Sequence, residues 1–287
     1  MKNYVIFTDS GSDLSEDFLK KLKVTSLPLS VKFDGEDELS DYEISPSKFY
    51  QKIKDGKMAK TAAVNQRTFF DKFKAAAERG YDILYLGLSS VISSTYSSAK
   101  GAAATLSREF PKRKILTFDS KCASAGLGLL VYLVSLKRDE GASIDEAFDY
   151  ASLIAPRICH RFTVDDLTFL RKGGRISAVS AFFGNALGIK PLLYMDSGGY
   201  LKSSDKVRGR RAAIESLARS FGDLKSESIN EAIFISHADC FKDASLLDEI
   251  LHKKYGCRAK RIFDIGAVIG AHAGPGTLAL FFIGNMR

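Results

Sequence analysis

The sequence contains few of the residues that build metal and disulfide sites. Its 287 residues include no tryptophan and only four cysteines, four histidines and six prolines. The cysteines are widely separated, and none belongs to a C-x-x-C pair. We therefore expect reduced thiols, and we predict neither a disulfide framework nor a metal site.

Long apolar runs are also missing. No stretch of eighteen apolar residues occurs, so the sequence does not indicate a membrane-spanning helix. The apolar patch within residues 1–14 is too short for a secretory signal. We expect a cytoplasmic protein with no transmembrane segment, whose contact with a membrane surface would be transient.

Nucleotide-binding and hydrolase motifs are absent or incomplete. The sequence has no G-x-x-x-x-G-K-[ST] loop, and Gly126-Leu127-Gly128 lacks the third glycine of a dinucleotide fingerprint. We therefore expect no nucleotide and no other cofactor. Gly87 to Val91 departs from the G-x-S-x-G pattern of serine hydrolases at its last position. Because a serine and a histidine can still meet in space, an acyl hydrolase or transferase that uses Ser93 and His272 stays an alternative.

Positive charge is concentrated in the second half of the chain. The formal net charge is +8, and basic clusters lie at residues 202–211 and 253–261. Such clusters can meet nucleic acid, an acidic protein or an anionic ligand, or form a solvated helical face. A nucleic-acid-binding regulatory module is therefore a second alternative. We do not expect nucleic acid as a partner, because the aromatic residues of a base-stacking surface are not interleaved with these charges.

Strands and helices alternate through the first half of the chain. Strand-like apolar segments at residues 3–8, 82–88 and 114–118 are each followed by a polar turn and a helical pattern. This alternation predicts a parallel sheet, which places ligands at the carboxyl ends of its strands. Those ends are rich in hydroxyl groups and carboxylates, typical of a polar site and also of ordinary solvated turns.

The pattern changes after about residue 158. A hairpin is indicated at Asp196 to Gly199, and an unbroken apolar strand follows Gly276. We therefore predict an α/β protein of two domains. An N-terminal parallel-sheet, Rossmann-like domain spans residues 1–158, and a C-terminal mixed-sheet α/β domain spans residues 159–287.

The segment from Gly266 to Ile283 combines a histidine with glycine-rich turns and an apolar strand. Small residues surround His272, and Gly274, Pro275 and Gly276 end any helix that precedes them. One interpretation is a site where the backbone approaches a ligand closely. The other is a tight turn before a core strand, with the imidazole hydrogen-bonded inside the protein.

The order of several motifs resembles one family over almost the whole chain. These motifs include Ser93 to Ala99, Ser124 to Gly128, Leu170 to Ile176, Ile189 to Pro191 and Ile269 to Thr277. Together they resemble the DegV family of bacterial fatty-acid-binding proteins. The resemblance implies a two-domain α/β protein that buries a long-chain fatty acid. It also implies a non-catalytic, lipid-binding subunit of a fatty acid kinase, active in phospholipid metabolism, whose ATP-binding partner subunit makes acyl phosphate.

Site residues follow from the same resemblance. Thr61, Ser93 and His272 match the residues that bind the carboxylate, and Arg175 and Arg208 match basic residues near the head group or the kinase contact. Two hydroxyl groups and an imidazole can replace the water that a buried carboxylate loses.

The sequence departs from the family pattern beside two of these positions. Where the family usually continues with Ser-Gln-Pro after Thr61, this chain has Ala62-Ala63-Val64, and Ser94 replaces a glycine. Both changes alter the expected surroundings of the head group.

The acyl tail needs apolar walls, which supply most of the affinity. Burial is worth about 0.8 kcal/mol per methylene, so a chain of roughly sixteen carbons gains on the order of 10 kcal/mol before ordering costs. Each candidate for the wall can equally be simple core. The candidates are Phe162, Ile176, Phe182, Phe183, Leu187, Ile189, Leu278 and Leu280.

Overall fold

A computed structural model describes residues 4–165, 167–176, 188–226, 232–285 and 287. Sheet A has the strand order β2-β1-β6-β7 and is parallel throughout. Its strands are β1 (Tyr4–Asp9), β2 (Val24–Leu27), β6 (Asp82–Gly87) and β7 (Ile115–Asp119). The predicted parallel sheet of the first half is therefore confirmed.

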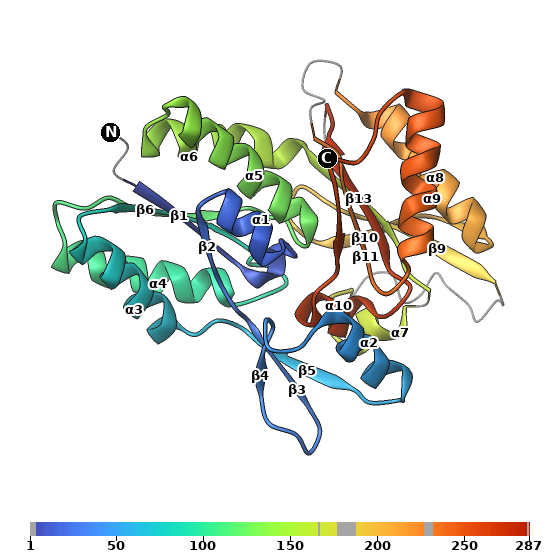
Figure 1. Ribbon diagram of the computed structural model, residues 1–287, viewed down its shortest axis with the longest axis horizontal. Coiled ribbons are helices and arrows are strands. Elements are labelled where there is room, and N and C mark those ends of the chain that lie inside the picture. The colour runs from blue at the N-terminus through green and yellow to red at the C-terminus, as the bar shows by residue number, and fades with distance from the viewer. Residues whose placement is uncertain (1–3, 166, 177–187, 227–231, 286) are drawn as a thin grey trace.

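Helices cover both faces of sheet A (Figure 1). The helices α3 (Gln66–Glu78) and α4 (Thr95–Glu109) lie on one side, and α5 (Ala125–Glu140) and α6 (Ile144–Ile154) lie on the other. The short helix α1 (Glu16–Lys21) connects β1 to β2 after a 3-10 turn, Ser10–Ser12. Side-chain caps set several helix starts: Ser15, Asn65 and Ser143 each accept a hydrogen bond from the first turn.

Helix α5 is buried between sheet A and a second sheet, sheet C. It contacts β6 on one side and β8, β11 and β13 on the other, and apolar residues surround its whole axis, as expected of a buried helix. Glycine permits the close approach to sheet C, because a Cβ atom at Gly126 would lie 2.2 Å from Nε2 of His160.

Sheet C has the order β10-β9-β8-β13-β11-β12, with β11 and β12 parallel and the other pairs antiparallel. The predicted mixed sheet is therefore confirmed. Helices α8 (Arg210–Leu224) and α9 (Phe241–Tyr255) cover its outer face (Figure 1). The strands are β8 (Ile158–Thr163), β9 (Ile189–Met195), β10 (Leu201–Arg208), β11 (Phe234–His237), β12 (Arg261–Asp264) and β13 (Leu278–Ile283).

A small third sheet, sheet B, brings β5 to the helix that carries His272. It consists of β3 (Ser30–Phe33), β4 (Leu39–Ser40) and β5 (Ala59–Ala62). This sheet packs with α2 (Pro46–Lys54) and α10 (Ala267–Ala273) around a separate apolar cluster. Thr61 on β5 therefore lies beside His272 on α10, although 211 positions of the sequence separate these two residues.

The predicted division between residues 158 and 159 stays a prediction. The largest apolar cluster joins residues from both sides of it, from Ile6 on β1 to Phe281 on β13. Within the described parts of the chain, no helix has both the length and the apolar character needed to cross a membrane.

Candidate functional site

A cavity of about 220 Å³ lies between the carboxyl-terminal loops of sheet A and the inner face of sheet C. Residues from loops after β6 and β7 form one wall, and β8 and β13 form the facing wall. Most of the lining is apolar. Representative apolar residues are Leu29, Leu88, Ile92, Val268, Ala279 and Phe281.

Thr61 and His272 form the polar end of this cavity. Oγ1 of Thr61 lies 2.8 Å from Nε2 of His272, and both residues line the cavity. The loop side chains of Ser93 and Arg175 line it as well. The structure thus places four of the five predicted head-group residues at one cavity, from four separate segments of the chain.

The imidazole of His272 is neutral near pH 7. Burial, with a smaller contribution from the positive charge of Arg175, lowers its pKa to about 4. Its Nδ1 atom has no hydrogen-bond partner among the described residues and lies against Gly173. Because Nδ1 is buried, the ring itself has no donor free for a ligand. When Nε2–H donates to the Thr61 hydroxyl oxygen, the hydroxyl proton can donate one hydrogen bond to a ligand oxygen.

Ser93 is oriented by the start of α4. Its Oγ lies 2.9 Å from Oγ1 of Thr95 and accepts a hydrogen bond from the Thr95 backbone N–H at 3.2 Å. Nε2 of His272 is engaged by Thr61 instead. The nucleophile–base hydrogen bond that the acyl hydrolase alternative requires is therefore not formed between these two described residues.

The two predicted arginines occupy different places. Arg175 follows α7 (Thr168–Lys172) and donates from Nε to the carbonyl oxygen of Ile92 at 3.2 Å, which ties its loop to the loop after β6. Arg208 ends β10 and is exposed, and it does not belong to the cavity lining. Any role of Arg208 is therefore at the surface.

Three of the four residues that depart from the family pattern line the cavity. They are Ala62, Ala63 and Ser94, and Ala62 and Ser94 are exposed, whereas Val64 is buried and is not part of the lining.

The residues predicted to form the acyl-tail wall do not all lie at the cavity, and their role in holding a tail stays a prediction. Phe162 lines the cavity, but Leu278 and Leu280 pack on the opposite face of β13 against α8 and α9. Successive side chains of a strand point to opposite faces, so Ala279 and Phe281 take the positions facing the cavity. Neither Ile176, in the main core, nor Ile189, on β9, lines the cavity. The remaining candidates, Phe182, Phe183 and Leu187, lie outside the described residues.

His160 is a cavity residue that the sequence reasoning missed. It is buried; its Nδ1–H donates to the carbonyl oxygen of Ile158 at 2.9 Å, and its Nε2 accepts from the backbone N–H of Ala123 at 3.3 Å. Burial is the main cause that holds its pKa well below the ordinary value. Its position two residues before Phe162 on the same strand was the available signal, because both must face the same way.

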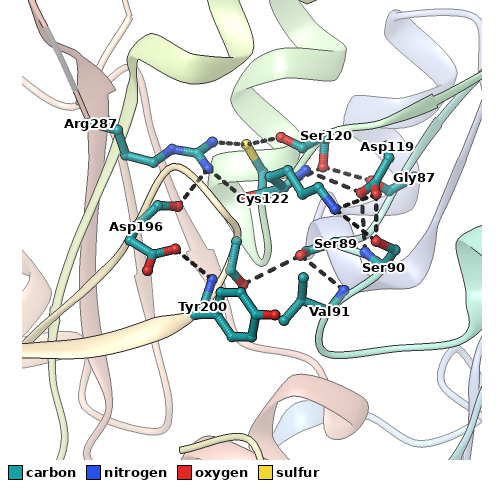
Figure 2. Close-up of polar contacts among 12 residues, drawn as sticks. Gly87, Ser89, Ser90, Val91, Asp119, Ser120, Cys122, Asp196, Tyr200 and Arg287 are labelled. Carbon is teal, nitrogen blue, oxygen red and sulfur yellow. Dashed lines mark hydrogen bonds and ion pairs between the residues drawn. The ribbon is translucent and has the colours of Figure 1, made fainter. Parts of the chain in front are cut away.

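The polar side chains at the strand ends mostly form hydrogen bonds within the protein. Asp9 on β1 accepts hydrogen bonds from the Tyr85 hydroxyl and the backbone N–H groups of Gly11 and Leu88, and is not part of the cavity lining. At the ends of β6 and β7, Ser90 and Asp119 bond to each other (Figure 2). Leu88 at the end of β6 lines the cavity, as do Ser93 and Ser94 in the loop that follows.

Two aspartates hold the N-terminal end of α10. Asp41 accepts a hydrogen bond from the backbone N–H of Val268 at 3.1 Å, and Asp13 accepts one from Gly266 at 2.9 Å. Burial raises the pKa of Asp13 to about 8 and also raises that of Asp41. These contacts fix the helix that positions His272. Within the described residues, no group of three or more acidic, histidine or cysteine side chains is arranged to hold a metal ion.

Comparisons with known proteins agree on one family. The family model for uncharacterised proteins of the DegV family matches residues 3–285. A DegV domain-containing protein of Clostridium perfringens is 39% identical, and the alignment covers 100% of this chain and 99% of that protein.

Solved structures show the same fold. A DegV lipid-binding protein from Thermotoga maritima superposes with a TM-score of 0.87 at 29% identity, covering 100% of both chains. A DegV family protein from Thermus thermophilus, described as binding fatty acid, gives a TM-score of 0.88 at 28% identity, covering 98% of this chain and 99% of that one. With a family match across nearly all residues and a relative well above 30% identity, this chain belongs to the DegV family.

Proposed function

We propose that this protein binds a long-chain fatty acid, with the acyl tail in the cavity and the carboxylate at the Thr61–His272 end. One observation carries the proposal: an apolar cavity between two sheets ends at a hydroxyl–imidazole pair. A ligand that fits must be apolar over most of its length and polar at one end. The lipid-binding and fatty-acid-binding relatives from Thermotoga maritima and Thermus thermophilus support the same ligand class.

The neutral imidazole suits a carboxylate that must later react. A protonated histidine would form a strong ion pair and hold the anion firmly, whereas hydroxyl groups and a neutral ring satisfy it at lower strength. With its pKa near 4, the imidazole of His272 is uncharged at neutral pH, and the positive charge in the cavity lining comes from Arg175. Affinity then comes mainly from the tail, at about 0.8 kcal/mol per buried methylene.

The proposal extends to a partner kinase subunit. This chain would present the carboxylate, and one carboxylate oxygen would attack the γ-phosphorus of ATP held by the partner. An O–P bond to the acyl group forms as the bond to ADP breaks, giving acyl phosphate and ADP. Arg175 beside the cavity and Arg208 on the surface are the cations proposed to face the transferring phosphoryl group or the partner. The absence of a nucleotide-binding loop in this sequence motivates the separate subunit.

Native mass spectrometry of purified protein tests the first part. We expect a co-purifying fatty acid, removed by denaturation and extraction, and restored stoichiometrically when oleic or palmitic acid is added to the refolded protein. A protein that is empty after purification and also takes up neither acid would refute fatty acid binding.

The second part needs an ATP-binding partner from the same cell. Lysate from which this protein has been removed should regain ATP-dependent acyl phosphate formation when loaded protein is returned. The His272→Asn variant should restore much less activity while still carrying the acid. Equal activity from both proteins would contradict the role of His272 in presenting the carboxylate.

A further inference from the structure

The end of the cavity remote from His272 can be located from the strand register. Along β13, the lining residues are Thr277, Ala279 and Phe281 in order of distance from α10. Ala279 pairs with Phe162, and Phe281 pairs with His160. The four residue steps from Thr277 to Phe281 span roughly 13 Å at about 3.3 Å per residue. An extended acyl chain advances about 1.3 Å per carbon for bonds of about 1.5 Å, so this span holds about ten carbons.

The β9–β10 hairpin supplies further side chains at this remote end. Strands β8 and β9 are antiparallel, and Arg161 on β8 pairs with Tyr194 on β9. The adjacent position therefore places Met195 on β9 opposite His160 on β8. Met195 pairs in turn with Leu201 across the hairpin, and both line the cavity. Met195 is buried, with 1% of its surface exposed. The two residues that flank the hairpin turn thus wall the cavity where an acyl tail ends.

Arg287 holds this hairpin in place (Figure 2). Its guanidinium donates to the carbonyl oxygen of Asp196 in the turn at 3.2 Å. The same group also donates to the carbonyl oxygens of Ala155 at 2.8 Å and Ile158 at 3.0 Å, and contacts Sγ of Cys122 at 2.8 Å. The guanidinium therefore joins the turn to the loop after β7 and to the start of β8.

Among the described residues, the turn makes one further hydrogen bond to the loops of sheet A. Ser89 donates a long hydrogen bond, 3.4 Å, to the carbonyl oxygen of Gly199 (Figure 2). The remaining contacts of Asp196 are local to the turn, because it bonds to the backbone of Gly199 and Tyr200. Of these two bonds to the turn, the one from Arg287 is the shorter, at 3.2 Å, and its guanidinium is itself anchored by Ala155 just before β8 and by Ile158 at the start of β8.

We propose that Arg287 is a positioning residue that sets the limit on acyl-chain length, by fixing the hairpin whose Met195 and Leu201 close the tail end of the cavity. The inference rests on the proposed fatty acid binding and adds a length limit to it. Below the limit, each added methylene enters the cavity and raises the affinity about fourfold. Beyond it, an added methylene meets the hairpin and brings no further gain.

The test compares saturated acids from dodecanoic to docosanoic acid, binding to delipidated protein. In the wild type, affinity should rise with length and then level off or fall. In Arg287→Ala, the acid length at which the affinity stops rising should shift by two or more carbons. For acids shorter than the wild-type limit, the affinity should change less than threefold. Arg157→Ala is the matched control, because Arg157 also bonds to a backbone carbonyl and to Ser226 but does not touch the hairpin.

A second variant tests the same limit if Arg287→Ala does not fold. Met195→Ala shortens a wall side chain directly and leaves the contacts of Arg287 intact, so it should also move the limit to longer acids. An unchanged limit in Met195→Ala and in any folded Arg287→Ala overturns the proposal. So does an equal loss of affinity at every length in Arg287→Ala, which indicates a purely structural role. A wild type that binds no acid of any length refutes the proposed function itself, which is a distinct result.

Discussion

Nε2 of His272 lies 2.8 Å from Oγ1 of Thr61 at the polar end of an apolar cavity. The contact joins β5, in a sheet formed by the first quarter of the chain, to α10 near its end. Because Thr61 lies on sheet B and His272 lies on α10, the pair depends on the packing of sheet B against α10.

Replacing Thr61 with valine tests the hydroxyl while keeping the side-chain shape. Loss of one hydrogen bond to the acid should weaken binding by about 1 kcal/mol, roughly fivefold, because the tail supplies most of the affinity. Titration with a fluorescent or isotopically labelled fatty acid measures this. Thr25→Val, at an exposed position on β2, is the control and should bind like the wild type. A Thr61→Val protein with unchanged affinity would remove Thr61 from the site.

Gly173 should tolerate no side chain, because a Cβ atom there would lie 2.4 Å from Nδ1 of His272. Its φ of −71° is ordinary, so the effect of Gly173→Ala would come from this contact and not from backbone strain. We expect the imidazole to move away from Thr61 and the affinity for fatty acid to fall several-fold. Lys172→Ala, at the exposed neighbouring position, should leave the affinity unchanged. Equal affinities for both variants would contradict the placement of the ring.

The charge of Arg175 contributes to the low pKa of His272, after burial. Replacing Arg175 with glutamine should therefore raise the pKa of His272 from about 4 towards its ordinary value, without reaching it, because the ring stays buried. Binding of a carboxylate should also raise this pKa, since a nearby negative charge favours the imidazolium. Titration of the His272 ring signals by NMR measures both shifts. A fall of the pKa in either case would contradict this description of the site.

Ionisation of the buried Asp13 carboxyl group should lower the stability of the folded protein as the pH rises. Its pKa in the folded protein, about 8, is above the unfolded value near 4, so the folded state binds more protons between these values. The contribution of Asp13 to stability is therefore complete below about pH 4 and is lost as the pH rises through 8.

Asp13→Asn removes this titration and keeps an oxygen for the backbone N–H of Gly266. Thermal unfolding of both proteins between about pH 6.5 and pH 8 isolates the effect of Asp13, because the other titrating groups are common to the variant and the wild type. The variant should lose less stability than the wild type over this interval. Parallel curves for the two proteins would show that Asp13 is ionised throughout.

The two faces of β13 should respond differently to substitution. Ala279→Leu places a larger side chain in the cavity and should exclude the acyl tail, lowering affinity more than tenfold. Leu280→Ala, on the face that packs against α8 and α9, should cost about 2–5 kcal/mol of stability and leave binding by the folded protein unchanged. Binding assays and denaturant titrations on both variants would separate the two effects, and the reverse pattern would contradict the assignment of the faces.

Local sequence signals predicted much of the fold and less of the site. The parallel sheet of the first half and the last strand follow from the spacing of apolar residues. The strand β5 lacks such a signal, because Ala59–Ala62 is short and only half-buried.

The composition of β13 could not predict which face of the strand lines the cavity. All six residues of this strand are apolar and buried, so alternation in the sequence does not distinguish the cavity face from the face against α8 and α9. The pairing of Phe281 with His160 across β13 and β8 decides it, and that pairing is a tertiary property. For the same reason, Met195 and Arg287 gained their proposed roles only from the structure.

The most direct test of this account is the structure of the delipidated protein soaked with palmitic acid and determined by crystallography. We predict continuous elongated density in the cavity, with the carboxylate within hydrogen-bond distance of the Thr61 hydroxyl, beside His272, and the tail running towards Phe281. A cavity that stays empty at saturating acid, or a carboxylate found at the Phe281 end, would contradict it.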